Sequence, residues 1–258
     1  MPRREGLGMS YAAIFLITTT NEKSIYTTFM KKPLAIFWDM DGTLTDSEPL
    51  WEEATYFLSE LLGKRLTPEQ RQLTVGSTFE NTLRVCAAAA GVELREEDYP
   101  KYRALTFNKT RELFAERLEV FPGIQNLLTQ LKGDGIPMLV TTNTVRHVAD
   151  SAIDTVGRHF FVDTICGDEV AEGKPAPDMY LEAARRVGVD PADALVFEDS
   201  TTGMRAALAA GCHVIGLPEH DQVEIPEGAV GIDKLRGDKH LNGAKAADVY
   251  DWFARISG

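Results

Sequence analysis

Residues 36–44 read Ile-Phe-Trp-Asp-Met-Asp-Gly-Thr-Leu, an apolar run that ends in two aspartates, one residue apart, and a glycine. A strand that stops at Asp39 and turns through Gly42 would bring both carboxylates to one site at the edge of a sheet. Two carboxylates there can bind a divalent cation, and one can attack an electrophile while the other moves a proton. The same residues also fit a solvated turn after a buried strand, because Asp-Gly is a common turn pair.

The composition is that of an ordinary globular protein and excludes some classes of function. Of the 258 residues, 44% are hydrophobic and 26% are charged, enough chain for one large domain or two modest ones. The formal net charge of −12 argues against nucleic-acid binding, which needs a basic patch. It does not exclude an anionic substrate, because a pocket can be locally cationic. The cysteines Cys86, Cys166 and Cys212 lack CxxC spacing, so we expect buried thiols in a reducing, cytoplasmic setting, with no disulfide or zinc.

The first 29 residues differ from the rest of the chain. Their apolar run, 11–17, follows Arg3 and Arg4 and faintly resembles a signal peptide. It is too short to span a bilayer, and no small-x-small cleavage site follows it. We therefore predict a disordered extension over 1–29, a domain that begins at Met30, and no membrane association. Met30 or Met9 is the expected natural start.

The segment 47–120 has helical patterns and no convincing strand. Apolar residues recur at helical spacing over 51–62, and Thr67 precedes a proline and a glutamine in capping-box order. Further helices are expected over 81–90 and within 97–118. We predict that 47–120 is an all-helical cap.

From Phe121 onward, strands and helices alternate, which is typical of a parallel sheet. Strands are expected at 137–141, 162–166, 194–197, 213–217 and 229–232. Helices are expected at 124–131, 145–156, 178–187, 202–210 and 244–256. The predicted fold class is therefore α/β: a Rossmann-like parallel sheet core over 30–46 and 121–258, with the helical cap inserted after the first strand.

Three further polar segments follow predicted strands: Thr142-Asn143, Lys174 between two prolines and a glycine, and Glu198-Asp199. Ligands of open α/β sheets bind at the carboxyl ends of the strands, where these segments would meet the aspartates. Each segment alone has a structural interpretation, as loop capping, a solvated lysine or an acidic N-cap. Together they suit a magnesium-assisted transfer of a phosphoryl group.

These motifs, DMDGT (39–43), Thr142, Lys174 in GKPAPD and Glu198-Asp199 in FEDS, resemble in order and spacing those of the haloacid dehalogenase superfamily of phosphohydrolases. The resemblance covers about 34–217 and points to the subgroup with a helical cap. It implies Asp39 as the nucleophile, which forms an aspartyl-phosphate, and Asp41 as the acid/base.

The same resemblance implies the other site residues. Mg²⁺ would be held by Asp39, the Asp41 backbone carbonyl and Asp199, with Glu198 nearby or directly bound. Thr142 and Lys174 would hold the phosphoryl oxygens, with Asn143 beside them on the substrate. Lys174 and the metal would offset the charges of the phosphate and the nucleophile.

Several functions share this core. The acid at 41 argues against dehalogenases, which do not use an aspartate there. Mutases similar to β-phosphoglucomutase use a cap histidine and a cap arginine where this chain has Trp51 and Phe79. The stretch DSEPLW (46–51) is more similar to sugar-phosphate phosphatases, so we expect hydrolysis of a small phosphorylated metabolite, such as a sugar or glycerol phosphate. A mutase is the alternative, a non-catalytic binder is the third, and no protein partner is implied.

The cap is expected to set the substrate specificity, since it would close over the leaving group. Trp51, Ser77, Thr78 and Asn81 are candidate lining residues. Each also has a structural interpretation, Trp51 as packing core and Ser77 or Thr78 as an N-cap.

Overall fold

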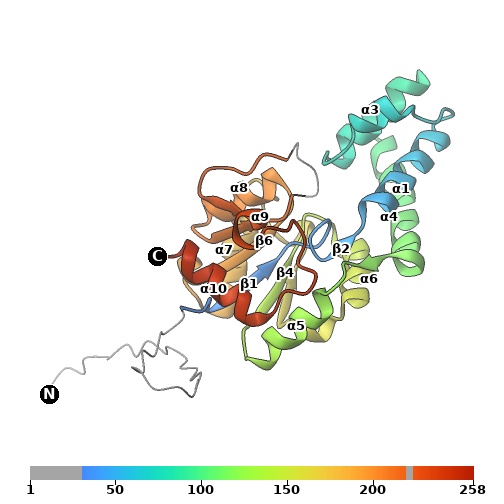
Figure 1. Ribbon diagram of the computed structural model, residues 1–258. Coiled ribbons are helices and arrows are strands. Elements are labelled where there is room, and N and C mark those ends of the chain that lie inside the picture. Colours follow the sequence, from blue (N-terminus) through green and yellow to red (C-terminus); the bar gives the residue numbers. More distant parts are fainter. Residues whose placement is uncertain (1–30, 219–222) are drawn as a thin grey trace, which may run out of the picture.

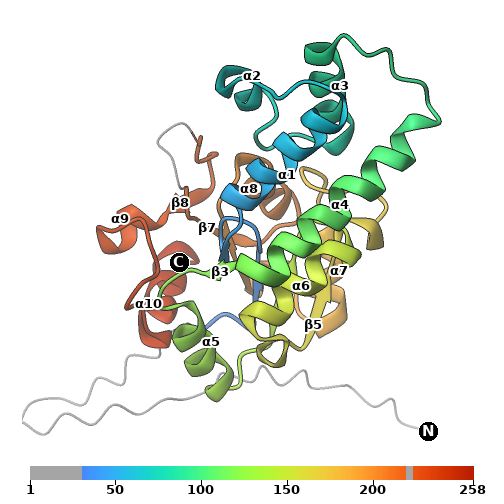
Figure 2. The same ribbon diagram turned by 90° about the vertical axis from the view of Figure 1, so that its right-hand side faces the viewer.

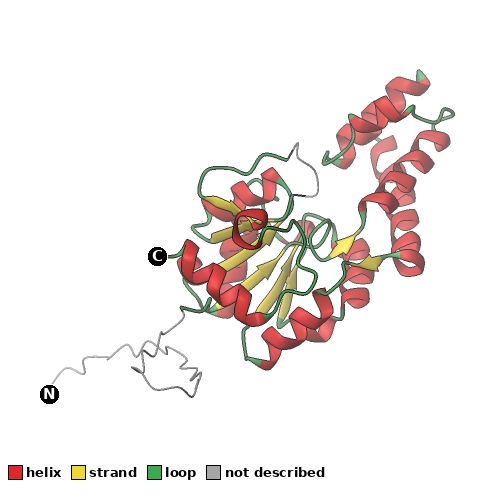
Figure 3. Cartoon of the chain, viewed as in Figure 1, coloured by secondary structure: helices red, strands yellow, loops and turns green. Residues whose placement is uncertain are grey.

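The computed structural model describes residues 31–218 and 223–258, so the predicted extension over 1–29 lies outside the described residues. Its centre is a six-stranded sheet in the order β5-β4-β1-β6-β7-β8, with every neighbouring pair parallel (Figure 1, Figure 3). The strands are β1 (Ala35–Trp38), β4 (Met138–Thr141), β5 (Asp163–Ile165), β6 (Ala194–Glu198), β7 (His213–Gly216) and β8 (Ala229–Gly231). The predicted α/β class with a parallel, Rossmann-like sheet is confirmed.

The first strand lies in the middle of the sheet because it is apolar on both faces. All four of its residues are buried, and Phe37 is in register with Leu139 of β4 and Val196 of β6. Strands covered on both faces typically read as continuous hydrophobic runs. Its alternate side chains enter two separate cores, Ile36 and Trp38 on one face and Ala35 and Phe37 on the other.

Helices cover both faces of the sheet. α5, α6 and α10 pack on the face that Trp38 joins, and α7 and α8 pack on the opposite face. These helices are α5 (Ile124–Gly133), α6 (Arg146–Val156), α7 (Asp178–Val187), α8 (Thr201–Ala209), α9 (Ile232–Arg236) and α10 (Ala246–Ile256). Short 3₁₀ turns lie at η1 (Arg158–Phe160), η2 (Gly167–Glu169) and η3 (Pro191–Asp193). The sequence did not predict α9, because five residues are too few for a helical period to show.

Four helices follow the first strand and project from the end of the sheet (Figure 1, Figure 2). They are α1 (Glu48–Leu61), α2 (Pro68–Gln72), α3 (Phe79–Ala90) and α4 (Asp98–Arg117). The capping box expected at Thr67 is present, and the Thr78 hydroxyl caps α3. The helices share a small core of their own around Leu58, Leu83 and Cys86.

A short antiparallel pair joins this insertion to the sheet. β2 (Thr45–Asp46) runs toward the insertion and β3 (Glu119–Val120) returns from it, with Thr45 opposite Val120 (Figure 3). The prediction that 47–120 contains no strand is therefore wrong at 119–120. A two-residue strand is too short to show the alternation from which strands are predicted.

The last helix of the insertion also contacts the main domain. α4 lies along α6 (Figure 2), and its residues Leu113 and Phe114 are buried in the same apolar cluster as Val148 and Ala152 of α6. The insertion is thus tied to the sheet domain by the β2–β3 pair and by packing against α6. No helix within the described ranges 31–218 and 223–258 is long and apolar enough to cross a membrane.

Candidate active site

The predicted site residues meet at the carboxyl ends of three neighbouring strands. Asp39 directly follows β1, Thr142 follows β4, and Asp199 follows β6. Lys174 comes from the loop between η2 and α7 and reaches the same place. Parallel strands end at one edge of the sheet, and for this reason segments far apart in the sequence deliver their side chains together.

A buried lysine is the centre of this group. The Lys174 ammonium donates to Asp39 Oδ1 at 2.6 Å and to the backbone carbonyl of Thr141 at 2.9 Å, and it also pairs with Glu198. Burial opposes its charge, but the carboxylates of Asp39 and Glu198 outweigh burial and raise the pKa of Lys174 well above its usual range. Lys174 is therefore a fixed cation beside Asp39.

Glu198 is fully occupied by protein donors. Besides Lys174, its Oε1 accepts the Tyr180 hydroxyl at 3.0 Å, and its Oε2 accepts both the backbone N–H and the hydroxyl of Ser200, at 3.1 and 3.0 Å. A Cβ at Gly203 would lie 1.8 Å from Oε1, so the first turn of α8 fits only without a side chain there. The arrangement makes Glu198 an anchor for Lys174.

Asp39, Glu198 and Asp199 place carboxylate oxygens within 4.8 Å of one another. Asp39 Oδ2 is buried and has no hydrogen-bond partner. Burial, together with the charge of Glu198, raises the pKa of Asp39 to about 8, and burial with the charge of Asp39 raises the pKa of Asp199 well above its usual range. An unpartnered buried oxygen among crowded carboxylates is the environment that a divalent cation bound to oxygen ligands would satisfy. The residues therefore fit a divalent metal.

Gly42 makes the turn that directly follows the two aspartates. Its backbone has φ +80°, a conformation that favours glycine, and a Cβ there would lie 2.3 Å from Asp199 Oδ2. The turn thus packs directly against the acid that follows β6.

Asp41 accepts four side-chain hydrogen bonds, one pair on each oxygen. Oδ1 accepts from Ser47 Oγ at 2.7 Å and from Trp51 Nε1 at 3.0 Å. Oδ2 accepts from Thr144 Oγ1 at 2.8 Å and from Thr142 Oγ1 at 3.3 Å. The carboxylate is therefore held between the loop after β4 and the start of the helical insertion.

Two residues predicted to touch substrate have protein partners here. Besides its contact with Asp41, the Thr142 hydroxyl accepts the Thr144 N–H at 3.0 Å. The Asn143 side chain accepts the Lys174 N–H at 2.9 Å and donates to the Lys174 carbonyl at 3.1 Å. Asn143 thereby fixes the backbone of the loop that carries the lysine.

Ser47, Thr144, Tyr180 and Ser200 were not among the predicted site residues. Ser47 stands in DSEPLW and Ser200 in FEDS, and Thr144 directly follows Thr142-Asn143, so these hydroxyls were available signals. Tyr180 has no such signal, because it occupies a buried position of α7 and has the pattern of a core residue.

Of the cap candidates, Trp51 both contacts Asp41 and packs against aromatic side chains of α4. Thr78 accepts the N–H of Asn81 as an N-cap, and Asn81 donates to the Ser77 hydroxyl at 2.6 Å. These three residues serve the start of α3.

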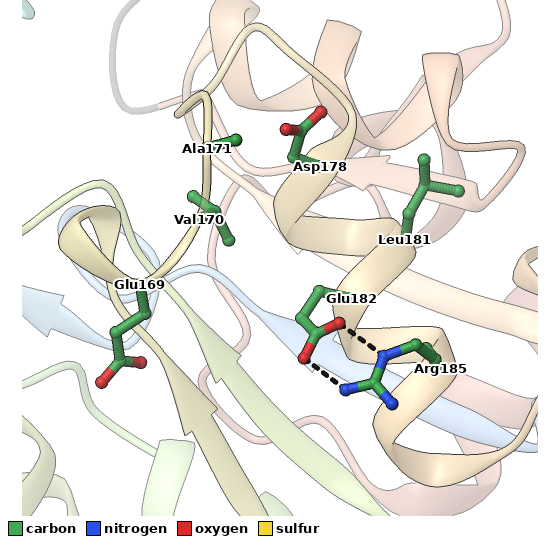
Figure 4. A pocket seen from close by; sticks show the side chains of 7 residues that line it. All are labelled: Glu169, Val170, Ala171, Asp178, Leu181, Glu182 and Arg185. Atoms are coloured by element: carbon green, nitrogen blue, oxygen red, sulfur yellow. Dashed lines mark hydrogen bonds and ion pairs between the residues drawn. The ribbon is translucent and has the colours of Figure 1, made fainter.

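A pocket of about 400 Å³ lies between residues 169–171 and α7. Figure 4 shows the side chains that line it. Its polar lining includes Glu182 and Arg185, which pair with each other at 2.7 Å. None of the predicted site residues lines it, so the pocket is unrelated to the carboxylate cluster.

The chain belongs to the haloacid dehalogenase-like hydrolases, whose family model matches residues 33–211. It is 32% identical to a probable pseudouridine-5'-phosphatase of Drosophila melanogaster, over 74% of this chain and 84% of that protein. It is 33% identical to the fructose-1-phosphate phosphatase YqaB of Escherichia coli, over 70% and 95%. A crystal structure of a putative beta-phosphoglucomutase from Thermotoga maritima superposes with a TM-score of 0.64 at 26% identity, covering 86% of this chain and 99% of that one. The prediction of a hydrolase of the phosphatase class is confirmed.

Proposed function

We propose that this chain hydrolyses the phosphate monoesters of small metabolites, sugar or polyol phosphates, through an aspartyl-phosphate and with Mg²⁺. The observation that carries the proposal is the buried Lys174 ammonium 2.6 Å from Asp39 Oδ1, while Asp39 Oδ2 has no partner. A nucleophile needs a free oxygen and a fixed cation to receive an anionic phosphoryl group, and this pair supplies both.

Two aspartates account for every bond and proton in the proposed reaction. Asp39 attacks phosphorus, the bond from phosphorus to the leaving oxygen breaks, and Asp41 gives its proton to the departing alcohol. Asp41 then takes a proton from water as that water attacks the phosphorus of the aspartyl-phosphate, which releases inorganic phosphate and restores Asp39. Lys174 holds the phosphoryl oxygens and offsets their charge throughout.

Mg²⁺ would be held by Asp39, Asp199 and the backbone carbonyl of Asp41. When bound, it neutralises negative charge on the phosphate and the nucleophile. Because both oxygens of Glu198 already accept protein hydrogen bonds, we propose that Glu198 acts through Lys174 and not as a direct ligand.

The proposed substrate class is supported by the names of the similar phosphatases and by the presence of the helical insertion. The names of the two phosphatases above refer to a nucleoside-like and a sugar phosphate, both small polyhydroxylated esters. We propose that 47–120 is a cap that selects the leaving group, and that 30–46 with 121–258 is the catalytic core. The three cysteines are free and buried, which supports a reducing location such as the cytoplasm.

A substrate panel with and without Mg²⁺ tests the proposal. We expect inorganic phosphate to be released from fructose 1-phosphate, pseudouridine 5'-phosphate or glycerol phosphate, only with the metal. Asp39→Asn should abolish turnover and leave the fold intact. The matched control is Asp154→Asn, since Asp154 has a side chain that is 63% exposed on α6 and should tolerate the change. Conversion of glucose 1-phosphate to its isomer without phosphate release would favour a mutase, and turnover by Asp39→Asn would refute the mechanism.

A further inference from the structure

The carboxylate of Asp41 is held partly by the helical insertion. Its Oδ2 is bound by the two threonines of the loop after β4, which belong to the sheet domain. Its Oδ1 is bound by Ser47, at the end of the β2 segment, and by the indole N–H of Trp51, at 2.7 and 3.0 Å. Ser47 precedes α1 directly and Trp51 lies in its first turn, so two of the four hydrogen bonds come from the insertion 47–120.

The position of the indole is set by α4. The Trp51 ring meets Phe114 edge-on, with centroids 5.6 Å apart and planes at 84°, and meets Phe107 at 6.5 Å and 80°. Phe114 is buried in the cluster that also contains the apolar side chains of α6. Edge-to-face contacts of this kind fix the orientation of a ring. The indole N–H is therefore aimed at Asp41 by the same packing that joins α4 to the sheet domain.

An indole N–H can orient an acid but cannot replace it. Trp offers one donor, accepts no hydrogen bond and does not titrate. The side chain of Trp51 can thus hold Asp41 in one orientation without exchanging a proton with it.

We propose that Trp51 is a positioning residue for Asp41, so that proton transfer to the leaving group depends on the packed position of the insertion. The inference rests on the acid/base role of Asp41 under the proposed function. When the insertion is seated as in Figure 2, with α4 along α6, the carboxylate is directed by donors from both sides. Without the indole, one oxygen keeps only the Ser47 hydroxyl.

The inference predicts which substrates should be hydrolysed more slowly when the Trp51 N–H is removed. An alkyl alcohol is a poor leaving group and needs a well-placed proton donor. 4-Nitrophenol leaves readily as its anion and hardly needs one. A defect in orienting Asp41 should therefore slow the transfer of the phosphoryl group to Asp39, which kcat/KM reports, much more for alkyl phosphates than for 4-nitrophenyl phosphate. The later attack of water uses Asp41 with either substrate, so kcat itself does not discriminate between them.

The decisive variant is Trp51→Phe, which keeps an aromatic ring for α4 and removes the N–H. We expect kcat/KM for glycerol phosphate, or the best alkyl phosphate of the panel, to fall about tenfold or more, and kcat/KM for 4-nitrophenyl phosphate to change less than about twofold. Trp252→Phe makes the same chemical change on α10 and should leave both substrates unaffected.

A second variant separates orientation from folding. Phe107→Leu keeps the indole N–H and removes one of its edge contacts, so we expect a smaller loss with the same dependence on the leaving group. Equal losses of kcat/KM on both substrates would overturn the inference. A wild-type protein without phosphatase activity would refute the proposed function itself. Activity that needs Asp41 but is unchanged in Trp51→Phe would refute only the role of Trp51.

Discussion

Replacing Gly203 with alanine should disturb the site through Glu198. Gly203 is in the first turn of α8, and a Cβ there would lie 1.8 Å from Glu198 Oε1 and 2.2 Å from Oε2. Real Cβ contacts are not shorter than 3.0 Å, so the carboxylate has to move by roughly an ångström or the helix has to shift. Glu198 is completely buried, and neither movement leaves its hydrogen bonds intact.

The expected cost follows from the bonds that would break. Glu198 accepts from Tyr180 at 3.0 Å, from Ser200 at 3.0 and 3.1 Å, and pairs with Lys174. Each hydrogen bond to a charged group contributes about 1.5–3 kcal/mol, and disrupting a buried ion pair costs about 3–5 kcal/mol. We therefore expect Gly203→Ala to lower the free energy of unfolding by about 3–5 kcal/mol and the melting temperature by about 10 °C. Turnover should fall about 100-fold, because the lysine would lose its anchor.

Thermal unfolding and phosphate release, measured on the same samples, would test this expectation. The matched control is Gly133→Ala at the end of α5, where a Cβ would meet no atom within 4 Å. That change should alter the free energy of unfolding by less than about 1 kcal/mol, in the stabilising direction. A Gly203→Ala protein as stable and as active as the control would refute the tight fit between α8 and Glu198.

Two further predictions concern ion pairs outside the site. The hydrogen bonds of Arg146 hold the pKa of Glu169 below its ordinary value of 4.5, so this carboxylate stabilises the fold above that pH and the stabilisation is lost as the pH falls further. Glu169→Gln should therefore lower the free energy of urea unfolding at neutral pH, and a difference from the wild type that persists unchanged to about pH 2 would contradict the linkage. The second ion pair joins Arg71, whose side chain is 5% exposed, to Glu48 at 2.7 Å. Arg71→Met should therefore lower the free energy of unfolding by about 1–3 kcal/mol. As a control, Arg65→Met removes one member of an exposed pair and should lower the free energy of urea unfolding by less than about 1 kcal/mol. Equal losses in the two variants would refute the idea that burial makes the Arg71 pair the stronger one.

The sequence predicted the elements that have many residues of consistent pattern. The buried strands and the amphipathic helix at 178–187 lie where their hydrophobic periods placed them. The polar segments that follow β1, β4 and β6 could also be assigned to one edge, because the position of a residue along a parallel strand determines the end at which it lies. Asp39 and Glu198 lie at one edge for that reason, and Lys174 reaches them from the loop between η2 and α7.

The directions of the side chains in the loops could not be predicted. The contact of Asn143 with substrate stays a prediction. The binding of its amide to the backbone of Lys174 could not be foreseen, because it depends on how two loops from different parts of the chain meet. Tyr180 has the pattern of an apolar position, and only the three-dimensional contact of its hydroxyl with Glu198 connects it to the site. For Trp51 the sequence offered packing core or cap lining. The ring packs against Phe114, and the indole N–H donates to Asp41, a contact that neither interpretation included.

The β2–β3 pair has a consequence for how such a protein can vary. Since Thr45 and Val120 are paired, the chain leaves the sheet domain and returns to it at neighbouring points, about 5 Å apart. In topological terms the whole helical insertion is one very long hairpin loop, and the entropy of closing a loop rises only slowly with its length. A segment of another size or fold could replace it at small entropic cost, provided that it covers the face of α6 on which α4 now packs. The sheet domain and the insertion are joined by this two-residue pair, by the packing of α4 on α6 and by the hydrogen bonds of Ser47 and Trp51 to Asp41, so the parts of the insertion away from these contacts are free to change independently.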